Sequence, residues 1–325
     1  AVTKRVSAFV SELELRGAGA DILPEGAHAR LVRPARGALL RVAAPAASSG
    51  PLPKDLAQVL QTLRTDAESL RVAWVAENES ADVVLHVADE QLWFLPASGV
   101  LSKAGLNKTP SLSLAHEKQK LSELLADSLR RMVKAISLMR LAQQVPGDAA
   151  GGRVRVELVR LPDTADGATR PLTAAAIETL PDGARVGFSI TNKAHTPFDV
   201  TILYFDSAFG IAALFPGAGE DNRIMPGSVL SSISGAIDPI TINAETLGVE
   251  RLLVIATPAE PQSERTDYSY LAQPRLERAR GSGPASSLLS ELLEEAAFGT
   301  SARGATRGAS AEAFIQTFAW EVVKR

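Results

Sequence analysis

The sequence predicts an α+β chain in which an α/β region is followed by an antiparallel β-sandwich. Its 325 residues exceed the length that one ordinary core organises, so two domains are expected. Short apolar runs separated by Pro and Gly turns recur after residue 153, and this spacing is typical of a sandwich. The Pro- and Gly-containing stretch 146–152 separates the two patterns, so we expect domains at residues 1–148 and 153–325.

The first domain is expected to combine short strands with two helices. Apolar residues spaced three and four apart predict an amphipathic helix over 53–63 and a longer helix over 116–144. We interpret the long helix as lying across the strands of this domain, in preference to a coiled-coil or partner-binding helix. Strand-like runs are expected at 29–32, 38–43, 71–76, 82–87 and 91–95. Residues 6–15 fit a strand or a short helix, and their alternation favours a strand.

The second domain is expected to be built from short strands. Residues 153–158 alternate strictly between polar and apolar, as in a strand with one dry face. Residues 198–205 are β-branched and aromatic, and the turn at 206–210 joins them to 211–215 in a predicted β-hairpin. The polar stretch 262–284 is expected on the surface, and 286–298 as a short helix.

Further strands are expected at 185–192, 228–233, 240–243, 248–257 and 314–323. The last of these closes the chain and is expected to pair back into the sandwich. The regular succession of short strands predicts an immunoglobulin-like antiparallel β-sandwich.

The composition narrows the classes of function. A net charge of −3 gives no electrostatic case for nucleic acid binding, which needs a concentrated basic surface. The absence of cysteine excludes disulfides, thiolate metal sites and a cysteine nucleophile within these residues, and it fits either redox compartment. No apolar run reaches the roughly 18–20 residues that cross a bilayer. The chain begins at Ala1 without a methionine, so we expect a piece of a longer polypeptide or a processed product.

The sequence predicts no catalytic residue, no metal site and no cofactor site. The four histidines (His28, His86, His116 and His195) have no carboxylate or second histidine at metal-ligand spacing. The nucleophile-elbow pattern G-x-S-x-G is missing, although a Ser-His-Asp constellation that comes together only in the fold leaves no trace in sequence spacing.

The candidate binding residues are Asp206, Glu220, Asp221, Asn222 and Arg223. Asp206 lies in the hairpin turn, and the other four form a polar loop that points into solvent or at a partner. The three acidic residues would hold Ca²⁺ only if turn and loop met, but the calcium-loop spacing is missing and a solvated loop is favoured. The hairpin aromatics form either a ligand groove or, as we favour, part of the core; they are Tyr204, Phe205, Phe209 and Phe215.

The order of features after residue 198 resembles a known family. The hairpin FDVTILYFDSAFGIAALFP is followed by DNRIMPGS and then by GVERLLVIAT. This order is similar to a domain of unknown function that lies C-terminal to the peptidase domain in many bacterial caspase-like proteins and is also attached to some bacterial kinases. The resemblance covers about residues 153–257, and its matching positions are Asp206, Gly210, Leu214, Phe215, Pro216, Asn222, Ile224, Gly227, Gly248 and Glu250.

The resemblance implies a role beside a peptidase and no peptidase activity in these residues. It implies a non-catalytic accessory or recognition region that binds a partner protein or the peptidase domain of its own parent chain. Its matching residues are expected to have structural roles. Gly210 and Gly227 allow turns with positive φ, Pro216 ends a strand, and Asn222 fixes the loop through hydrogen bonds from its side chain to the backbone. The first domain, with ADVVLHVADEQLWFLPASG, is similar to the spacer in such proteins.

Two other classes of function stay open at this point. One is a cell-envelope module that binds carbohydrate or another surface, which a parent gene with a signal peptide and no peptidase would favour. The other is a hydrolase of unrecognised type, which turnover of peptide or ester substrates by the purified chain would favour.

Overall fold

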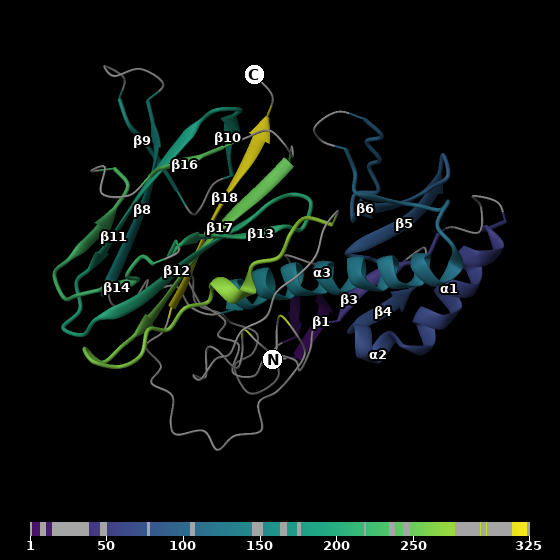
Figure 1. The fold of residues 1–325 in the computed structure, drawn as a ribbon, viewed down its shortest axis with the longest axis horizontal. Coiled ribbons are helices and arrows are strands. Elements are labelled where there is room, and N and C mark those ends of the chain that lie inside the picture. The colour runs from purple at the N-terminus through teal and green to yellow at the C-terminus, as the bar shows by residue number, and fades with distance from the viewer. Residues whose placement is uncertain are drawn as a thin grey trace. The chain divides into compact units, whose positions relative to one another are not determined.

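The structure of the chain is a computed structural model (Figure 1). It describes residues 2–6, 11–14, 39–45, 51–76, 79–104, 108–144, 152–162, 168–173, 177–217, 219–233, 238–242, 248–276, 293, 297 and 314–323. Contacts divide the chain into two compact units, residues 1–101 with 110–133, and residues 102–109 with 134–325.

The first unit is built on a five-stranded sheet in which β4, β3 and β5 are parallel neighbours and the remaining pairs are antiparallel. In spatial order the strands are β4 (Val72–Val75), β3 (Leu40–Ala43), β5 (Val83–Ala88), β6 (Gln91–Pro96) and β7 (Ser111–Ser113). A separate antiparallel pair joins β1 (Val2–Val6) to β2 (Ser11–Glu14). The strands predicted at 38–43, 71–76, 82–87 and 91–95 are thereby confirmed.

Two helices connect β3 to β4, because parallel neighbours need a crossover connection. They are α1 (Lys54–Thr65) and α2 (Ala67–Leu70). The four apolar residues of the predicted stripe are all buried, which confirms the helix expected at 53–63: Leu56, Val59, Leu60 and Leu63.

Helix α3 (Lys118–Gln144) confirms the long helix that the sequence predicts. The two compact units divide within it, between Val133 and Lys134, and not at residues 148–153. The reason is that apolar residues of its second half pack in a cluster with strands of the second unit. The expectation that the whole helix lies over first-domain strands is therefore wrong for this half.

Among its described residues, the second unit contains two sheets (Figure 1). The β11 sheet has the order β15 (Val229–Ser231), β11 (Arg185–Asn192), β8 (Val154–Leu161) and β9 (Arg170–Leu172), with β16 (Ile240–Thr241) also on β11. The β12 sheet has the order β10 (Glu178–Pro181), β18 (Phe314–Val323), β17 (Gly248–Pro258), β12 (Phe198–Phe205) and β13 (Ile211–Phe215), with β14 (Arg223–Ile224) on β12.

One hydrophobic core joins the two sheets of this unit. Alternate residues of strands in both sheets contribute to it, as pleated strands require. The cluster includes Val156, Leu158, Val186, Phe188, Ile190, Val200, Ile202, Leu252, Val254, Phe318 and Trp320. The described chain is therefore rich in β-structure, with two sheets of the second unit packed face to face.

The β12 sheet is covered on its other face as well. A second cluster joins Leu203 and Ile255 of this sheet to Leu138 of α3 and to Tyr268 and Leu271, which lie in the segment 259–276 after β17. Burial on both faces explains why β12 reads as a nearly continuous apolar run. The expectation that 262–284 lies on the surface is wrong for Tyr268 and Leu271, which are 1% and 0% exposed.

The closing strand is confirmed, since β18 pairs with β17 in antiparallel fashion. Its pairing with β10 is parallel, so the expectation of purely antiparallel sheets is wrong at this pair. Strand β18 lies between β10 and β17, which run in opposite directions, so it must be parallel to one of them. The predicted strand at 29–32 and, apart from Leu293 and Ala297, the predicted helix at 286–298 lie outside the described residues. Among the described helices, none has the length and apolarity that a membrane crossing requires.

Candidate functional site at the two ends of strand β12

A buried ion pair lies at the first end of β12. Asp199 on β12 and Arg223 on β14 are paired residues of the sheet. The Arg223 side chain donates from Nε to Asp199 Oδ1 at 2.7 Å and from Nη2 to Oδ2 at 2.8 Å. The two side chains are 1% and 0% exposed, so this bidentate pair is fully removed from water.

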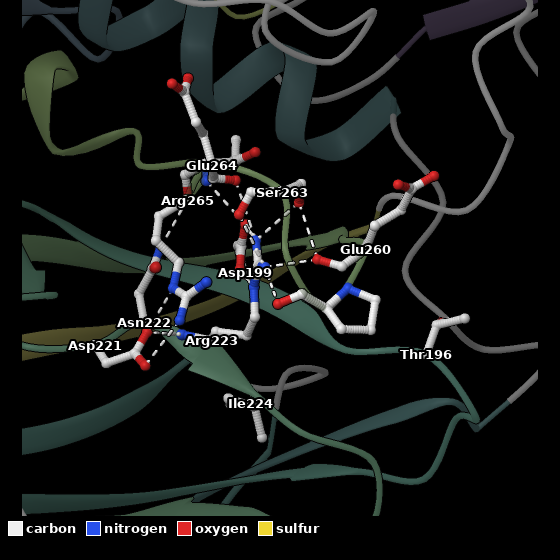
Figure 2. A network of polar contacts seen from close by, with 12 residues as sticks. Thr196, Asp199, Asp221, Asn222, Arg223, Ile224, Glu260, Ser263, Glu264 and Arg265 are labelled. Atoms are coloured by element: carbon white, nitrogen blue, oxygen red, sulfur yellow. Dashed lines mark hydrogen bonds and ion pairs between the residues drawn. The ribbon is translucent and has the colours of Figure 1, made fainter.

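The remaining donors of Arg223 hold the segment 259–276 (Figure 2). The Nη1 group donates to the carbonyl oxygens of Glu260 at 2.6 Å and Ser263 at 3.0 Å, and Nη2 donates to that of Glu264 at 3.1 Å. The amide of Thr266 donates to Asp199 Oδ2 at 2.8 Å. Because the buried guanidinium and carboxylate both bond to this backbone, they clamp the start of the segment against the β12 sheet.

The predicted polar loop is divided between buried and exposed residues. Asn222 is 2% exposed and its Nδ2 donates to the carbonyl of Thr266 at 2.7 Å, which confirms that it pins the loop. Arg223 is also buried, at 7% exposure for the whole residue with its backbone. The expectation that the loop points into solvent or at a partner is therefore wrong for these two residues, because backbone carbonyls of a distant segment need their donors.

Glu220 and Asp221 are exposed, as expected. Arg265 donates from Nε to Asp221 Oδ1 at 2.7 Å, and the Gly217 amide donates to Glu220 Oε2 at 2.7 Å. The hydrogen bond from Arg265 holds the pKa of the Asp221 carboxyl below its usual range. In the part of the chain that the structure describes, no three acidic or histidine side chains gather as a metal site would need, so Asp206 does not join these two carboxylates.

A second ion pair lies at the other end of β12. Asp206 follows the strand directly, and its Oδ1 accepts hydrogen bonds from the amides of Ala208 at 2.8 Å and Gly210 at 2.7 Å. Its Oδ2 accepts one from Arg275 Nε at 2.8 Å. The Asp206 side chain is 6% exposed and that of Arg275 is 38% exposed, so this pair is buried on one side only.

The turn that carries Asp206 differs from the expected conformation. The left-handed residue is Phe209, with φ of 64°, and Gly210 does not have a positive φ. A Cβ on Gly210 would lie 2.9 Å from Arg275 Cγ and would overlap Asp206 Oδ2. Glycine is therefore required here because the ion pair closes over it. The expectation of a positive φ is wrong at Gly210 and confirmed at Gly227, whose φ is 74°.

The far end of the segment 259–276 runs beside β13 and leaves a hollow of about 390 Å³ against the turn. Ile211 and Gln273 exchange two backbone hydrogen bonds of 2.8 Å, and Gln273 Nε2 donates to the Phe209 carbonyl at 2.7 Å. The residues that line the hollow include Tyr204, Asp206, Gly210, Ala212, Pro274 and Arg275.

A buried carboxylate lies behind the aromatic wall of the hollow. Tyr204 donates its hydroxyl to Glu250 Oε2, and Trp320 Nε1 donates to the same oxygen at 3.3 Å. The two rings are stacked with centroids 6.2 Å apart. Burial, followed by the charge of Glu250, raises the pKa of Tyr204 far above its usual range, so the hydroxyl remains a donor.

The hairpin aromatics are placed mainly as expected. Phe205 and Phe215 lie in the two hydrophobic clusters, which confirms that they are core residues. Tyr204 packs against the core between the sheets and also lines the hollow. His116 and His195 are exposed and His86 is half-buried.

Several residues of the site were missed in the sequence, namely Asp199, Gln273 and Arg275. An aspartate in the apolar run FDVTILYF is a signal of a buried ion pair, because an unpaired carboxylate would be costly there. Nothing local in the sequence marks Arg275, which is 69 residues from its partner Asp206. No family model matches the chain, and a search of curated proteins finds no match.

Proposed function

We propose that this chain is a non-catalytic recognition region of a bacterial caspase-like cysteine peptidase. In this role it binds a partner protein or the peptidase domain of its own parent chain, without cofactor or metal. We also propose that its two-sheet unit is an immunoglobulin-like sandwich, in which one end of the β12–β13 hairpin presents the binding residues.

The hollow beside the hairpin turn is the observation that carries this proposal. It combines an aromatic wall at Tyr204, small residues at Gly210 and Ala212, and one half-exposed ion pair. A concave site with an apolar lining and a few fixed polar groups is the usual form of a binding site. Asp206 and Gly210, which frame it, also belong to the sequence order that resembles the peptidase-associated domain.

Several other residues of the pattern that resembles the peptidase-associated domain have structural roles. Asn222 bonds to the Thr266 carbonyl, Phe215 lies in the core, and Glu250 accepts hydrogen bonds from Tyr204 and Trp320. A rigid scaffold that carries one open site on a turn is the arrangement that recognition domains commonly use.

The reading frame upstream of Ala1 is the first test. We expect it to encode a caspase-like domain with a catalytic His and Cys. A frame without such a domain would contradict the proposal, and a signal peptide in its place would favour the cell-envelope module that binds carbohydrate or another surface.

The second test separates recognition from catalysis in the parent polypeptide. Ala212→Trp fills the hollow, whereas Val229→Trp places the same side chain at an exposed position of β15. We expect the first variant alone to slow cleavage of a folded protein substrate, with cleavage of a short fluorogenic peptide unchanged in both. Equal effects of the two variants on the protein substrate would count against the hollow as the recognition site.

A further inference from the structure

The segment after β17 ends in a tip, residues 272–276, which is fastened to the hairpin turn, residues 206–210, and to the start of β13. Ile211 and Gln273 exchange two backbone hydrogen bonds of 2.8 Å. The Gln273 side chain donates from Nε2 to the Phe209 carbonyl at 2.7 Å. The tip therefore bonds to the backbone of the turn as well as to the edge of the sheet.

The turn is a strained element that depends on the tip. Phe209 has a φ of 64°, a left-handed conformation that is unfavourable for a bulky residue. The Asp206 carboxylate bonds to amides of the turn through Oδ1 and to Arg275 of the tip through Oδ2. Because the tip supplies hydrogen bonds to a backbone that is already strained, we expect the two elements to lose their order together.

The tip is less buried than the part of the segment that precedes it. Tyr268 and Leu271 are 1% and 0% exposed, whereas every residue of the tip is half-buried. The short 3₁₀ helix η2 (Ser269–Leu271) ends where the tip begins. Regions with few buried contacts open at a lower free energy than the core. We therefore expect local opening to include the tip and to stop at Leu271.

The start of the segment is fastened more firmly than the tip. The Asp199–Arg223 pair is withdrawn from water and bonds to the backbone there. The Arg275 side chain in the tip is 38% exposed, so water competes for its donors. The two ends of the segment are therefore expected to open independently of each other.

The hollow lies between the turn and the tip. Its lining includes Asp206 and Gly210 of the turn and Gln273, Pro274 and Arg275 of the tip. A volume of about 390 Å³ therefore exists while the two elements are closed on each other. Their separation would take the hollow apart without unfolding the sheets.

We propose that the turn and the tip open together as a latch on the hollow, while the Asp199–Arg223 pair keeps the start of the segment in place. The closed latch forms the binding site, and the open latch removes it. A ligand in the hollow stabilises the closed state, because it binds that state alone. This inference rests on the proposed recognition role and names how the same site is regulated.

Native-state hydrogen exchange, followed by NMR on the full isotope-labelled chain, tests the proposal. The reporters of the latch are the amides of Gly210, Ile211 and Gln273, and those of the start of the segment are the amides of Thr266 and Tyr268. Each of these amides donates a hydrogen bond. After correction for intrinsic rates, we expect equal protection of the three latch amides, at least about tenfold below that of Thr266 and Tyr268.

Two arginine variants of the same segment assign the opening. Arg275→Gln should accelerate exchange of all three latch amides by about fivefold, the upper range for a partly exposed ion pair, and leave Tyr268 unchanged. Arg265→Gln is the matched control, because its partner Asp221 lies outside the turn. We expect it to leave the latch amides unchanged.

Two results would overturn the latch. Equal protection of all five amides would mean that the whole segment opens as one body. Faster exchange of Gln273 in Arg275→Gln, with Gly210 unchanged, would mean that the turn and the tip open separately.

The outcome is distinguishable from that of the proposed function, because the exchange measurement needs neither a partner nor a peptidase. The expected exchange pattern, together with an upstream frame that encodes no peptidase, would keep the latch and remove the peptidase. A peptidase upstream, together with equal protection of all five amides, would keep the recognition role and remove the latch.

Discussion

Strand β12 carries an aspartate at each end, and the two aspartates hold the same segment in different ways. Asp199 and Arg223 are both withdrawn from water, and the arginine spends its donors on four backbone carbonyls and its partner. The Asp206 side chain is also largely shielded, at 6% exposure, but its partner Arg275 is 38% exposed. Two Asp–Arg ion pairs therefore differ in their surroundings: one fixes a segment at one end of the strand, and the other leaves a partly exposed arginine at the other end.

This difference shows that the solvent exposure of the arginine determines the role of each ion pair. A buried charge has lost its hydration and depends on every bond that the protein offers, so its contribution is structural. A guanidinium at the surface keeps part of its hydration and adds little stability, but it remains accessible to an anionic group. Four sets of variants test this comparison, in order of expected effect on the free energy of unfolding.

Removal of Arg223 should have the largest effect. Arg223→Met leaves the Asp199 carboxylate buried without its partner, and we expect the free energy of unfolding to fall by about 3–5 kcal/mol. Urea denaturation followed by circular dichroism measures the change. The double variant with Asp199→Leu should recover only part of this loss, because the carbonyls of the segment 259–276 still lack a donor. Full recovery would show that the clamp on the segment is unimportant.

Removal of the Tyr204 hydroxyl should cost less. Tyr204→Phe takes one donor from the buried Glu250 carboxylate, and we expect a loss of about 1–3 kcal/mol at neutral pH.

The pH dependence of this variant checks the cause. Because the raised pKa keeps the Tyr204 proton in the folded chain, its contribution to stability is complete below the pKa of an unfolded tyrosine, near 10, and declines as the pH rises above it. The difference in stability between Tyr204→Phe and wild type should therefore shrink above about pH 10. A difference that is constant from pH 8 to pH 11 would contradict the assignment.

Substitutions at Gly210 and Gly227 distinguish a steric requirement for glycine from a requirement for a left-handed backbone conformation. Gly210→Ala places a methyl group against the Asp206–Arg275 pair and should cost about 1–3 kcal/mol. Gly227→Ala meets no atom within 4 Å but requires a left-handed conformation, and should cost about 1 kcal/mol. Asparagine, which tolerates that conformation, should restore stability at Gly227 and not at Gly210. Thermal melts of the four variants give the comparison, and rescue by asparagine at both positions would refute it.

The surface pair should have the smallest effect. Arg265→Gln removes the partner of Asp221, but both side chains are largely in water, at 45% and 62% exposure. We expect an unchanged denaturation midpoint, because solvent and salt screen exposed pairs. A clear loss of stability at low and high salt alike would mean that this pair also holds the segment.

The regular elements are largely predictable from local pattern. Spacing of apolar residues placed α1 and α3, and alternation placed β8, because a helix or strand repeats its side-chain directions at a fixed period. The β12–β13 hairpin was placed by its β-branched and aromatic residues and by the turn between them. The burial of Tyr268 and Leu271 was not predictable in this way. Their segment reads as polar, and its place on the β12 sheet depends on donors from Arg223, far away in the sequence.

In the candidate site, too, some residues were predictable from local sequence and others were not. Sequence singled out Asp206 and Arg223, since a turn and a charged loop show themselves locally, but it assigned both to a surface without knowing their partners. The sequence does not show which residues pair with Asp199 and Asp206, because ion pairs between distant residues have no period in the sequence. The aspartate within the apolar run signals only that a partner is needed.

By itself, the sequence determined that the chain alternates short strands with two amphipathic helices, has no thiol chemistry in these residues and carries a hairpin with a charged turn. Those properties follow from local periodicity and from composition. Only the tertiary structure decided which aspartate faces water, which arginine holds the backbone and where a hollow forms. Burial and pairing depend on groups that folding brings together from 24 to 69 residues away, as in the pairs Asp199–Arg223 and Asp206–Arg275.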